Sequence, residues 1–432
     1  MTETRSHLPV GKVFVPGGLP TITYLPRNDL KLEARIRDYL DERHKILSLS
    51  GPTKSGKTVL LKSGVANGLW LSGGSIANSE DFWGQIADEL ELDTEFGRTE
   101  EASASAEHQN QVEGGAKPFG IGATATHASR KATQSSASTD KRRRSSAREV
   151  ARRALLTMQH TLIIDDFHYV EPAVQLDIVR GLKPLIFDGV PVILASVPHR
   201  AYDSVRVEKE MTGRVEQLAI PVWRHAELLS IASEGFAALN IDDPSKIAEQ
   251  LAKQGFGSPH LMQSFCLQLC KSQDLRERSE MSRAIVAPPV WKDFYRALSP
   301  GASKATYDLL TRGPRQRSDR KRRKRSDGVI TDIYGLVLAA IANTGPRTKL
   351  TYEEIRAALR RVIAPSESVP ERHEITRVLD EMCKIARNRI EGEMVMDFDP
   401  ELSILYISDP FFAFFLKWGF IEHGLRGIGP PA

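Results

Sequence analysis

The chain is poor in cysteine and has no long apolar run, and these absences exclude several classes of protein. Its 432 residues include three cysteines (Cys266, Cys270 and Cys383), too few for a disulfide framework and without a matching zinc-ligand set. We therefore expect all three to be small core or surface residues. No run of about 18 apolar residues occurs, so no membrane-spanning helix is expected. The first ten residues, MTETRSHLPV, lack the pattern of a secretion signal, and we expect a cytoplasmic protein.

Charged residues are ordinary in number but uneven in position. Hydrophobic residues make up 41% and charged residues 26% of the chain, which is typical of globular proteins, and 432 residues predict two or three domains. Residues 141–153 carry a net charge of +6 and residues 315–325 a net charge of +7, although the whole chain carries +4. The positive charge is therefore local, where a partner could use it.

The stretch GPTKSGKT at residues 51–58 fits the phosphate-binding pattern G-x-x-x-x-G-K-[ST] at every fixed position. The apolar segment KILSLS before it predicts a buried strand, and a helix is predicted to follow. Glycines let such a loop curl so that its N–H groups face phosphate oxygens, and the helix N-terminus adds partial positive charge. Lys57 is expected to reach the β- and γ-phosphates and Thr58 to bind Mg²⁺. The predicted phosphate-binding residues are Gly51, Pro52, Thr53, Lys54, Ser55, Gly56, Lys57 and Thr58.

A second motif, LIIDD at residues 162–166, predicts the carboxylates that a phosphate-binding loop needs. Its apolar residues predict a buried strand that ends in two acids. Asp165 is expected to join the magnesium shell and Asp166 to polarise the attacking water. The alternative is a strand that merely ends in solvated acids. His168 is expected to be a polar residue of the following turn.

At these two motifs the chain resembles the AAA+ class of P-loop ATPases, and within it the origin-recognition-like and STAND (NB-ARC-like) branch. The segments ILSLSGPTKSGKT and LIIDDFH are similar to its Walker A and Walker B motifs. The resemblance implies ATP and Mg²⁺ as cofactors, with an α/β parallel-sheet core, a helical lid and a C-terminal winged helix. The segment TYLPR resembles the part that such proteins place near adenine, which makes Tyr24 and Arg27 candidates there. A plain surface turn is the alternative.

The same resemblance assigns further candidates. VPVILASVPHR resembles the sensor-1 strand, with Ser196 as the first candidate and Arg200 as the second. Arg214 occupies the place of an arginine finger, which would serve a neighbouring subunit and so requires an oligomer; an ordinary surface charge is the alternative. Pro259 follows Gly257 and Ser258 as in the G-x-P motif of STAND proteins. His260 stands where a sensor-2 arginine is absent, which favours a nucleotide-gated switch over a fast motor.

Composition and periodicity suggest how the chain divides. Residues 97–146 are predicted to be a disordered insertion, because 23 of the 40 residues at 101–140 are Ser, Ala, Thr or Gly. Thr351 and Glu354 form a capping box, and three predicted helices followed by two strands suit a winged helix. The predicted parts are a nucleotide-binding core (1–222), a helical lid (223–312), a basic linker (313–328) and a winged-helix domain (329–425).

The basic segments 141–153 and 315–325 are candidates for nucleic-acid contact, since an exposed cationic run gives salt-dependent binding to phosphates. A localisation signal, an acidic protein partner and a solvated linker are alternatives for the second run. The third helix of the predicted winged helix is almost neutral, and many winged helices contact protein instead of DNA.

Three functions remain open from the sequence. The first is a nucleotide-gated, oligomerising switch in signalling or defence, with any effector protein supplied in trans. The second is a DNA-associated AAA+ ATPase of the replication-initiator or transposition-regulator type. The third is a pseudo-ATPase scaffold, which would follow if Asp166 is too short to position water.

Overall fold

The computed structural model describes residues 7–92, 146–197, 213–314, 320–345, 347–390 and 395–419. Most of the predicted insertion at 97–146 lies outside these residues, as do Arg200, residues 141–145 and residues 315–319. The chain forms two compact units, which are described one at a time. The sheet unit comprises Arg37–Ser48 and Val65–Gln217, and the lid unit comprises Met1–Ile36, Leu49–Gly64 and Leu218–Ala432.

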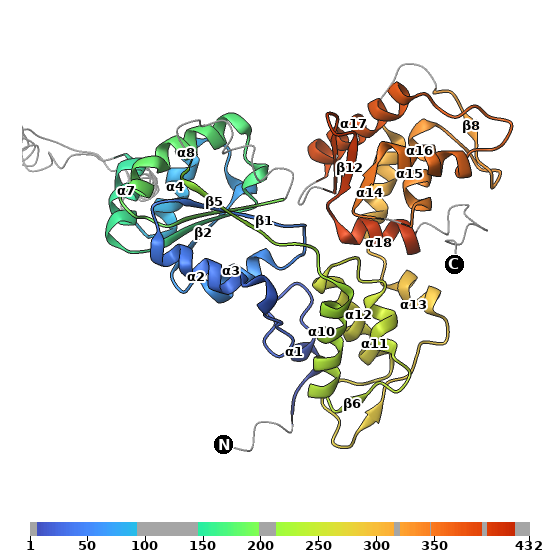
Figure 1. Cartoon of the computed structure of the whole chain (residues 1–432), viewed down its shortest axis with the longest axis horizontal. Coiled ribbons are helices and arrows are strands. Elements are labelled where there is room, and N and C mark those ends of the chain that lie inside the picture. The colour runs from blue at the N-terminus through green and yellow to red at the C-terminus, as the bar shows by residue number, and fades with distance from the viewer. Residues whose placement is uncertain are drawn as a thin grey trace, which may run out of the picture. The chain divides into compact units, whose positions relative to one another are not determined.

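A five-stranded sheet in the order β2-β3-β4-β1-β5 forms the α/β part (Figure 1). β2 pairs with β3 and β3 with β4 in parallel, with Leu71 opposite Ile164 and Ile164 opposite Leu194. The central strands are buried along almost their whole length, as expected where helices cover both faces of a parallel sheet. The predicted α/β class is therefore confirmed. The strands are β1 (Ile46–Ser50), β2 (Gly68–Ser72), β3 (Thr161–Asp165), β4 (Val192–Ser196) and β5 (Val215–Ala219).

The helices of the sheet unit share one apolar core with its strands. Phe82 and Trp83 are almost completely buried in it. Gly181 lets a neighbouring helix approach this core, because a Cβ there would lie 3.0 Å from Cζ2 of Trp83. The helices are α4 (Ser79–Glu89), α7 (Ala147–Thr157) and α8 (Pro172–Phe187), with short 3₁₀ turns η2 (Gly73–Ser75) and η3 (Phe167–Tyr169); α2 (Leu32–Glu42) runs from one unit into the other.

Helices from residues 225–297 pack around a second apolar core in the lid unit. Phe14 from the N-terminal segment meets Phe236 edge-on, with ring centroids 5.7 Å apart. Cys266 and Cys270 are buried here, and desolvation raises the pKa of the Cys270 thiol to about 12. The elements are α1 (Val10–Val13), η1 (Asn28–Leu30), α3 (Lys57–Gly64), α10 (His225–Ala238), β6 (Ile241–Asp242), α11 (Ile247–Ala252), α12 (Pro259–Ser272), β7 (Arg283–Ala284) and α13 (Trp291–Ala297).

The C-terminal part of the lid unit has its own core. Thr351 and Glu354 form the predicted capping box, and β11 and β12 form the predicted antiparallel hairpin with Phe398 opposite Leu405. The order helix, strand, helix, helix, strand, strand from α15 to β12 is the one that a winged helix requires. The elements are α14 (Gly301–Arg312), β8 (Arg323–Lys324), β9 (Ile330–Thr331), α15 (Ile333–Asn343), β10 (Lys349–Thr351), α16 (Tyr352–Val362), α17 (Arg372–Arg389), β11 (Met396–Asp399), β12 (Ile404–Ile407) and α18 (Pro410–Trp418).

Residues 320–328, the described part of the predicted basic linker at 313–328, are not a fully solvated segment. These residues enter a β8–β9 hairpin, and Arg323 and Arg325 are only 5% and 4% exposed. Arg323 Nη2 lies 3.2 Å from a Glu374 carboxylate oxygen, and Arg325 pairs with Asp327. A run of cations has the same sequence pattern whether it is solvated or paired, so only the fold could distinguish the two.

Arg320 of the same run is also engaged. Its Nη1 lies 2.6 Å from a carboxylate oxygen of Asp332, and its guanidinium lies over the ring of Tyr334 at 4.5 Å. Lys321, Arg322 and Lys324 remain exposed. Half of the cations in this described stretch therefore support the hairpin, and the other half face solvent.

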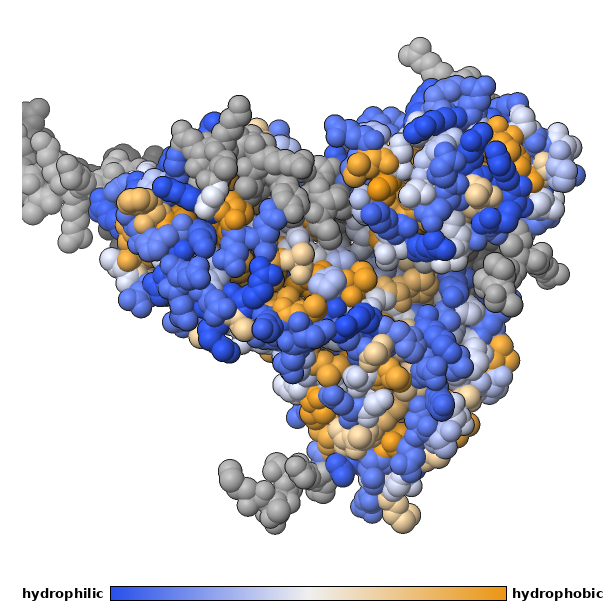
Figure 2. All heavy atoms as spheres, viewed as in Figure 1, coloured by the Kyte–Doolittle hydropathy of each residue, from blue (hydrophilic) through white to orange (hydrophobic). Residues whose placement is uncertain are grey.

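Hydrophilic residues cover most of the face seen in Figure 2. Over the described parts of the chain, no helix combines the length and the apolar character needed to cross a bilayer.

Candidate nucleotide-binding site

The loop at residues 51–56 joins the end of β1 to the start of α3, which begins at Lys57. Lys54 has φ +58° and Gly56 has φ +96°, so the backbone turns through the left-handed region twice within three residues. Such alternation points successive N–H groups into one concavity that suits an anion. Glycine suits position 51 for a steric reason, since a Cβ there would lie 3.0 Å from both Ile220 Cβ and Ser55 Oγ.

Lys57, the first residue of α3, is 7% exposed and its side chain reaches back over this loop. Its Nζ donates to the carbonyl oxygens of Gly51 at 3.0 Å and Pro52 at 3.1 Å. The ammonium group is therefore held over the loop by short contacts with the loop itself. These carbonyls are weaker partners for a cation than a phosphate would be.

The hydroxyl of Ser55 could also bind a phosphate oxygen. Ser55 is 3% exposed, and its Oγ has no hydrogen-bond partner among the residues that the structure describes. Thr53 is also buried, whereas Thr58, the predicted magnesium ligand, is exposed. Curled backbone, a poised ammonium group and a buried, unsatisfied hydroxyl are together the chemistry that fits a nucleotide phosphate.

The two acids of the second motif lie where β3 ends. Asp165 is the last strand residue, and its Oδ1 accepts from the backbone N–H of Asp166 at 3.0 Å. Asp166 has φ +54° and begins the η3 turn. Gly73 packs against this turn, because a Cβ on it would lie 2.3 Å from the carbonyl oxygen of Asp166. The backbone of the β2–α4 connection therefore fixes the direction in which β3 ends.

Ser196 ends the neighbouring strand β4 and is 5% exposed. The parallel register places Leu194 opposite Ile164, so Asp165 and Ser196, the last residues of β3 and β4, lie at the same edge of the sheet. The sensor-1 role of Ser196 stays a prediction. The second candidate, Arg200, lies outside the described residues.

Arg214 lies at the opposite edge of the sheet from the ends of β3 and β4. Its carbonyl oxygen accepts from the N–H of Ile46, the first residue of β1, at 2.9 Å. Its guanidinium lies 5.6 Å from the ring centroid of Phe187, a residue that is 65% exposed. The side chain is therefore at an accessible edge where another molecule could meet it.

Pro259 is the first residue of α12, and Ser258 caps that helix by accepting from the N–H of Leu261. The Ser258 hydroxyl also donates to the carbonyl oxygen of Lys54 in the phosphate-binding loop at 3.5 Å. Gly257 has φ +66°, and its carbonyl oxygen accepts from the N–H of Trp223. The predicted G-x-P segment is thereby joined to the loop within the same unit.

The guanidinium of Arg27 is fully engaged. Nε and Nη2 each lie 3.0 Å from one oxygen of the Glu227 carboxylate, and Nη1 donates to Pro221 O at 2.8 Å. Nη2 also donates to Val222 O. The predicted adenine contact of Arg27 therefore remains a hypothesis, because the structure points its donors at protein groups.

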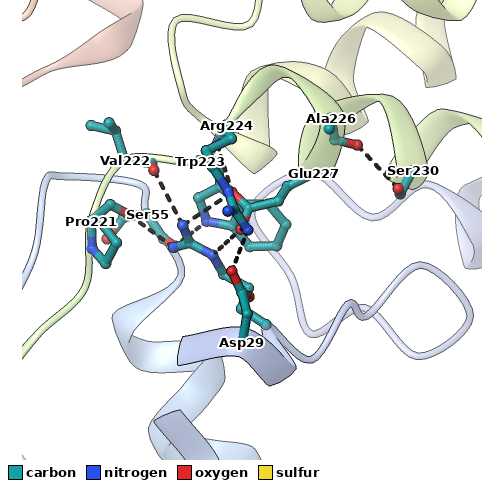
Figure 3. A network of polar contacts seen from close by, with 10 residues as sticks. Asp29, Ser55, Pro221, Val222, Trp223, Arg224, Ala226, Glu227 and Ser230 are labelled. Atoms are coloured by element: carbon teal, nitrogen blue, oxygen red, sulfur yellow. Dashed lines mark hydrogen bonds and ion pairs between the residues drawn. The ribbon is translucent and has the colours of Figure 1, made fainter. Parts of the chain in front are cut away.

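Trp223 and Glu227 are the residues that the sequence motifs did not indicate. The indole N–H of Trp223 donates to the carbonyl oxygen of Ser55 at 2.8 Å, and Arg27 lies over its ring at 5.1 Å (Figure 3). Arg224 Nη2 lies 2.9 Å from a carboxylate oxygen of Glu227. No motif marks these residues. The local sequence PVWRHAEL shows only that the apolar pair Val222 and Trp223 precedes a helix.

Tyr24, the other adenine candidate, donates its hydroxyl to Glu33 at 2.7 Å. Burial and the Glu33 carboxylate raise its pKa far above the ordinary value. The ring of His168 lies against that of Tyr169, with centroids 4.3 Å apart, as expected for a turn residue.

Comparison with known proteins supports the fold. No family model matches this sequence, and no curated protein sequence matches it. Among solved structures, the Walker-type ATPase PABY2304 of Pyrococcus abyssi is similar over 92% of this chain and 99% of its own, with 13% identity and a TM-score of 0.52. Cdc6p from Pyrobaculum aerophilum (98% of this chain and 100% of its own, 12% identity, TM-score 0.42) and ORC2 from Aeropyrum pernix (95% and 97%, 14%, 0.45) also match. The chain therefore has the fold of a Walker-type P-loop ATPase, as its motifs predicted.

Proposed function

We propose that this protein binds ATP with Mg²⁺, hydrolyses it slowly, and acts as a nucleotide-gated switch that works as a homo-oligomer. The observation that carries the proposal is the pair of contacts that Ser258 and Trp223 make with the carbonyl oxygens of Lys54 and Ser55. These residues flank the lid helices α10 and α12. A phosphate that reshapes the loop would therefore change contacts with the lid, which is the coupling that a switch needs.

Each predicted side chain has one role in this proposal. Lys57 leaves the loop carbonyls for the phosphates, and Thr58 and Asp165 hold Mg²⁺, which usually takes one or two protein ligands besides phosphate oxygens and water. Asp166 orients the attacking water, and Ser196 senses the γ-phosphate. Magnesium would supply neutralisation of the phosphate charge.

Arg214 is proposed to act on the nucleotide of a neighbouring subunit. Its backbone lies beside Ile46, where β1 begins, and its guanidinium lies near the exposed ring of Phe187. A guanidinium brought by a second subunit would neutralise charge that develops on the γ-phosphate. Loss of activity on dilution of the oligomer would follow.

The use of the switch in signalling or defence rests on the resemblance of the motifs and on the absence of a sensor-2 arginine at His260. Any effector would be a separate protein. The deciding experiment measures ATP hydrolysis by the full chain with and without duplex DNA, with Lys57→Ala as the blank. A slow rate that does not respond to DNA supports the switch, and strong stimulation by DNA contradicts it.

A DNA-associated AAA+ ATPase is the second candidate, favoured by the exposed side of the β8–β9 hairpin with Lys321, Arg322 and Lys324. α17, the third helix of the predicted winged-helix domain, gives this candidate less support. Lys384 there lies 2.8 Å from an oxygen of Asp380 in the same helix, and Arg387 lies 3.5 Å from an oxygen of Asp397 in β11, so two of its cations are paired with acids of the protein. Salt-dependent duplex binding, measured by fluorescence anisotropy, tests this candidate directly.

The informative variant replaces Lys321, Arg322 and Lys324 together with Ser. If these cations contact phosphates, the slope of log affinity against log salt falls by about three. The control replaces three exposed lysines elsewhere, Lys62, Lys253 and Lys271. An equal loss in both variants would indicate general charge attraction. Tight ATP binding without turnover in any condition would instead favour the pseudo-ATPase scaffold.

A further inference from the structure

The peptide unit between Ser55 and Gly56 is fixed from outside the phosphate-binding loop. Its carbonyl oxygen accepts a hydrogen bond of 2.8 Å from the indole N–H of Trp223, 168 residues later in the chain. In a trans peptide the carbonyl and the N–H point in opposite directions. Holding the Ser55 carbonyl toward Trp223 therefore turns the Gly56 N–H away from it, toward the concave side of the loop.

The loop cannot fix this peptide by itself. Gly56 has φ +96°, a conformation in which glycine rotates at low cost, so the Ser55–Gly56 peptide would otherwise turn over readily. The other contacts of the loop lie elsewhere: Lys57 Nζ bonds to the carbonyls of Gly51 and Pro52, and Ser258 to that of Lys54. The Trp223 indole bonds directly to the Ser55–Gly56 peptide.

Trp223 is in turn held in place. Its backbone N–H donates to Gly257 O, and the guanidinium of Arg27 lies 5.1 Å from its ring centroid (Figure 3). Arg27 is 6% exposed and is fixed by two contacts with Glu227. These contacts favour the indole orientation that directs its N–H at the Ser55 carbonyl.

We propose that Trp223 is a positioning residue of the nucleotide site, which aims the Gly56 N–H at the β-phosphate of a bound nucleoside di- or triphosphate. The inference rests on the proposed nucleotide binding. It adds that Trp223, which precedes α10 and is held by Arg27, raises the affinity of the site for the phosphate chain. AMP has no β-phosphate and is indifferent to this hydrogen bond.

The test compares Trp223→Phe, which keeps an aromatic ring over Arg27 and removes the N–H, with Trp83→Phe. Trp83 is a fair control because it is buried in the sheet unit and its Nε1 has no hydrogen-bond partner among the described residues. Affinities for ADP and AMP are measured by competition with a fluorescent ADP analogue. Trp223→Phe lowers the affinity for ADP by about three- to tenfold and leaves the affinity for AMP unchanged, as expected for the loss of one hydrogen bond. Trp83→Phe changes neither.

Equal ADP affinity in wild type and Trp223→Phe overturns the inference and leaves the proposed function intact. Failure of the wild-type chain to bind ADP removes the proposed function itself. Equal weakening of ADP and AMP shows a merely structural role and also overturns the inference.

A measurement on the unmutated chain covers the case in which Trp223→Phe does not fold. The five tryptophans give five indole N–H resonances, and single Phe replacements of the other four assign that of Trp223 by elimination. Binding of ADP shifts this resonance and AMP leaves it in place. A resonance that ignores ADP overturns the inference.

Discussion

Arg27 and Glu227, 200 residues apart in the chain, meet in a two-point ion pair with both contacts at 3.0 Å. Their side chains are 4% and 12% exposed, so the pair is largely removed from water. A buried pair of this kind gains little over apolar packing, but breaking it leaves one charge without a partner. The pair ties the segment before the phosphate-binding loop to the first turn of α10.

We predict that Glu227→Gln lowers the free energy of unfolding by about 3 kcal/mol, because it leaves the buried Arg27 charge uncompensated. Urea unfolding of the full chain measures the change. The control is Glu249→Gln, which breaks an exposed pair with Lys253 at 3.5 Å and should cost less than about 1 kcal/mol. Equal costs for the two variants would show that the Arg27 pair contributes no more than a surface contact.

The same carboxylate predicts a pH dependence. Burial alone would raise the pKa of Glu227, but hydrogen bonds from Arg27 and Arg224 outweigh it and hold the pKa below its ordinary value of 4.5. A group whose pKa is lowered by folding stabilises the protein above its unfolded pKa and loses this contribution as pH falls through its folded pKa. The stability of the wild type should therefore fall on acidification from about pH 5, and the stability of Glu227→Gln should fall less steeply. Parallel pH profiles would contradict this prediction.

Lys57→Ala should abolish nucleotide binding, because it removes the ammonium group that is held over the carbonyls of Gly51 and Pro52. Calorimetric titration with ATP and Mg²⁺ measures the loss. Lys62→Ala removes an exposed lysine from the same helix and should bind as the wild type does. Retained ATP affinity in Lys57→Ala would refute the assignment of the loop.

Asp166→Asn should retain ATP binding and lose turnover. Asp166 has φ +54°, a conformation that asparagine tolerates as well as aspartate, so the substitution removes the charge with little backbone strain. Phosphate release under saturating ATP measures the effect, and about a hundredfold loss is expected for removal of a general base. Unaltered turnover would show that Asp166 does not act on the attacking water.

Local features of the fold could be predicted from the sequence because short-range physics determines them. The strand before the phosphate-binding loop, the acids at the end of β3, and the capping box at Thr351 each depend on residues only a few positions apart. The contacts that complete the site do not. Trp223 reaches Ser55 across 168 residues, and nothing near either residue in the sequence indicates the partner.

The burial of Arg323 and Arg325 within the predicted linker could not be foreseen for a related reason. Arg323 is buried because Glu374, 51 residues away, lies beside it, and Arg325 is buried because a hairpin folds Asp327 back onto it. Composition alone favours a solvated segment wherever cations cluster. A compensating acid that comes from another element is invisible until the elements are placed.

Gly73 offers the last prediction, on the connection that supports the end of β3. A Cβ at this position would lie 2.3 Å from the carbonyl oxygen of Asp166, a backbone atom that cannot move without the strand end. Gly73→Ala should therefore cost about 1–3 kcal/mol of stability and displace Asp166, so that turnover falls more than ATP affinity. Gly84→Ala is the matched control: it lies within α4, a Cβ there meets nothing within 4 Å, and alanine should stabilise the helix by about 0.5–1 kcal/mol. If Gly73→Ala were as benign as Gly84→Ala in both unfolding and turnover, the β2–α4 connection would not be what orients Asp166, and the water-positioning role would have to rest on Asp166 and its strand alone.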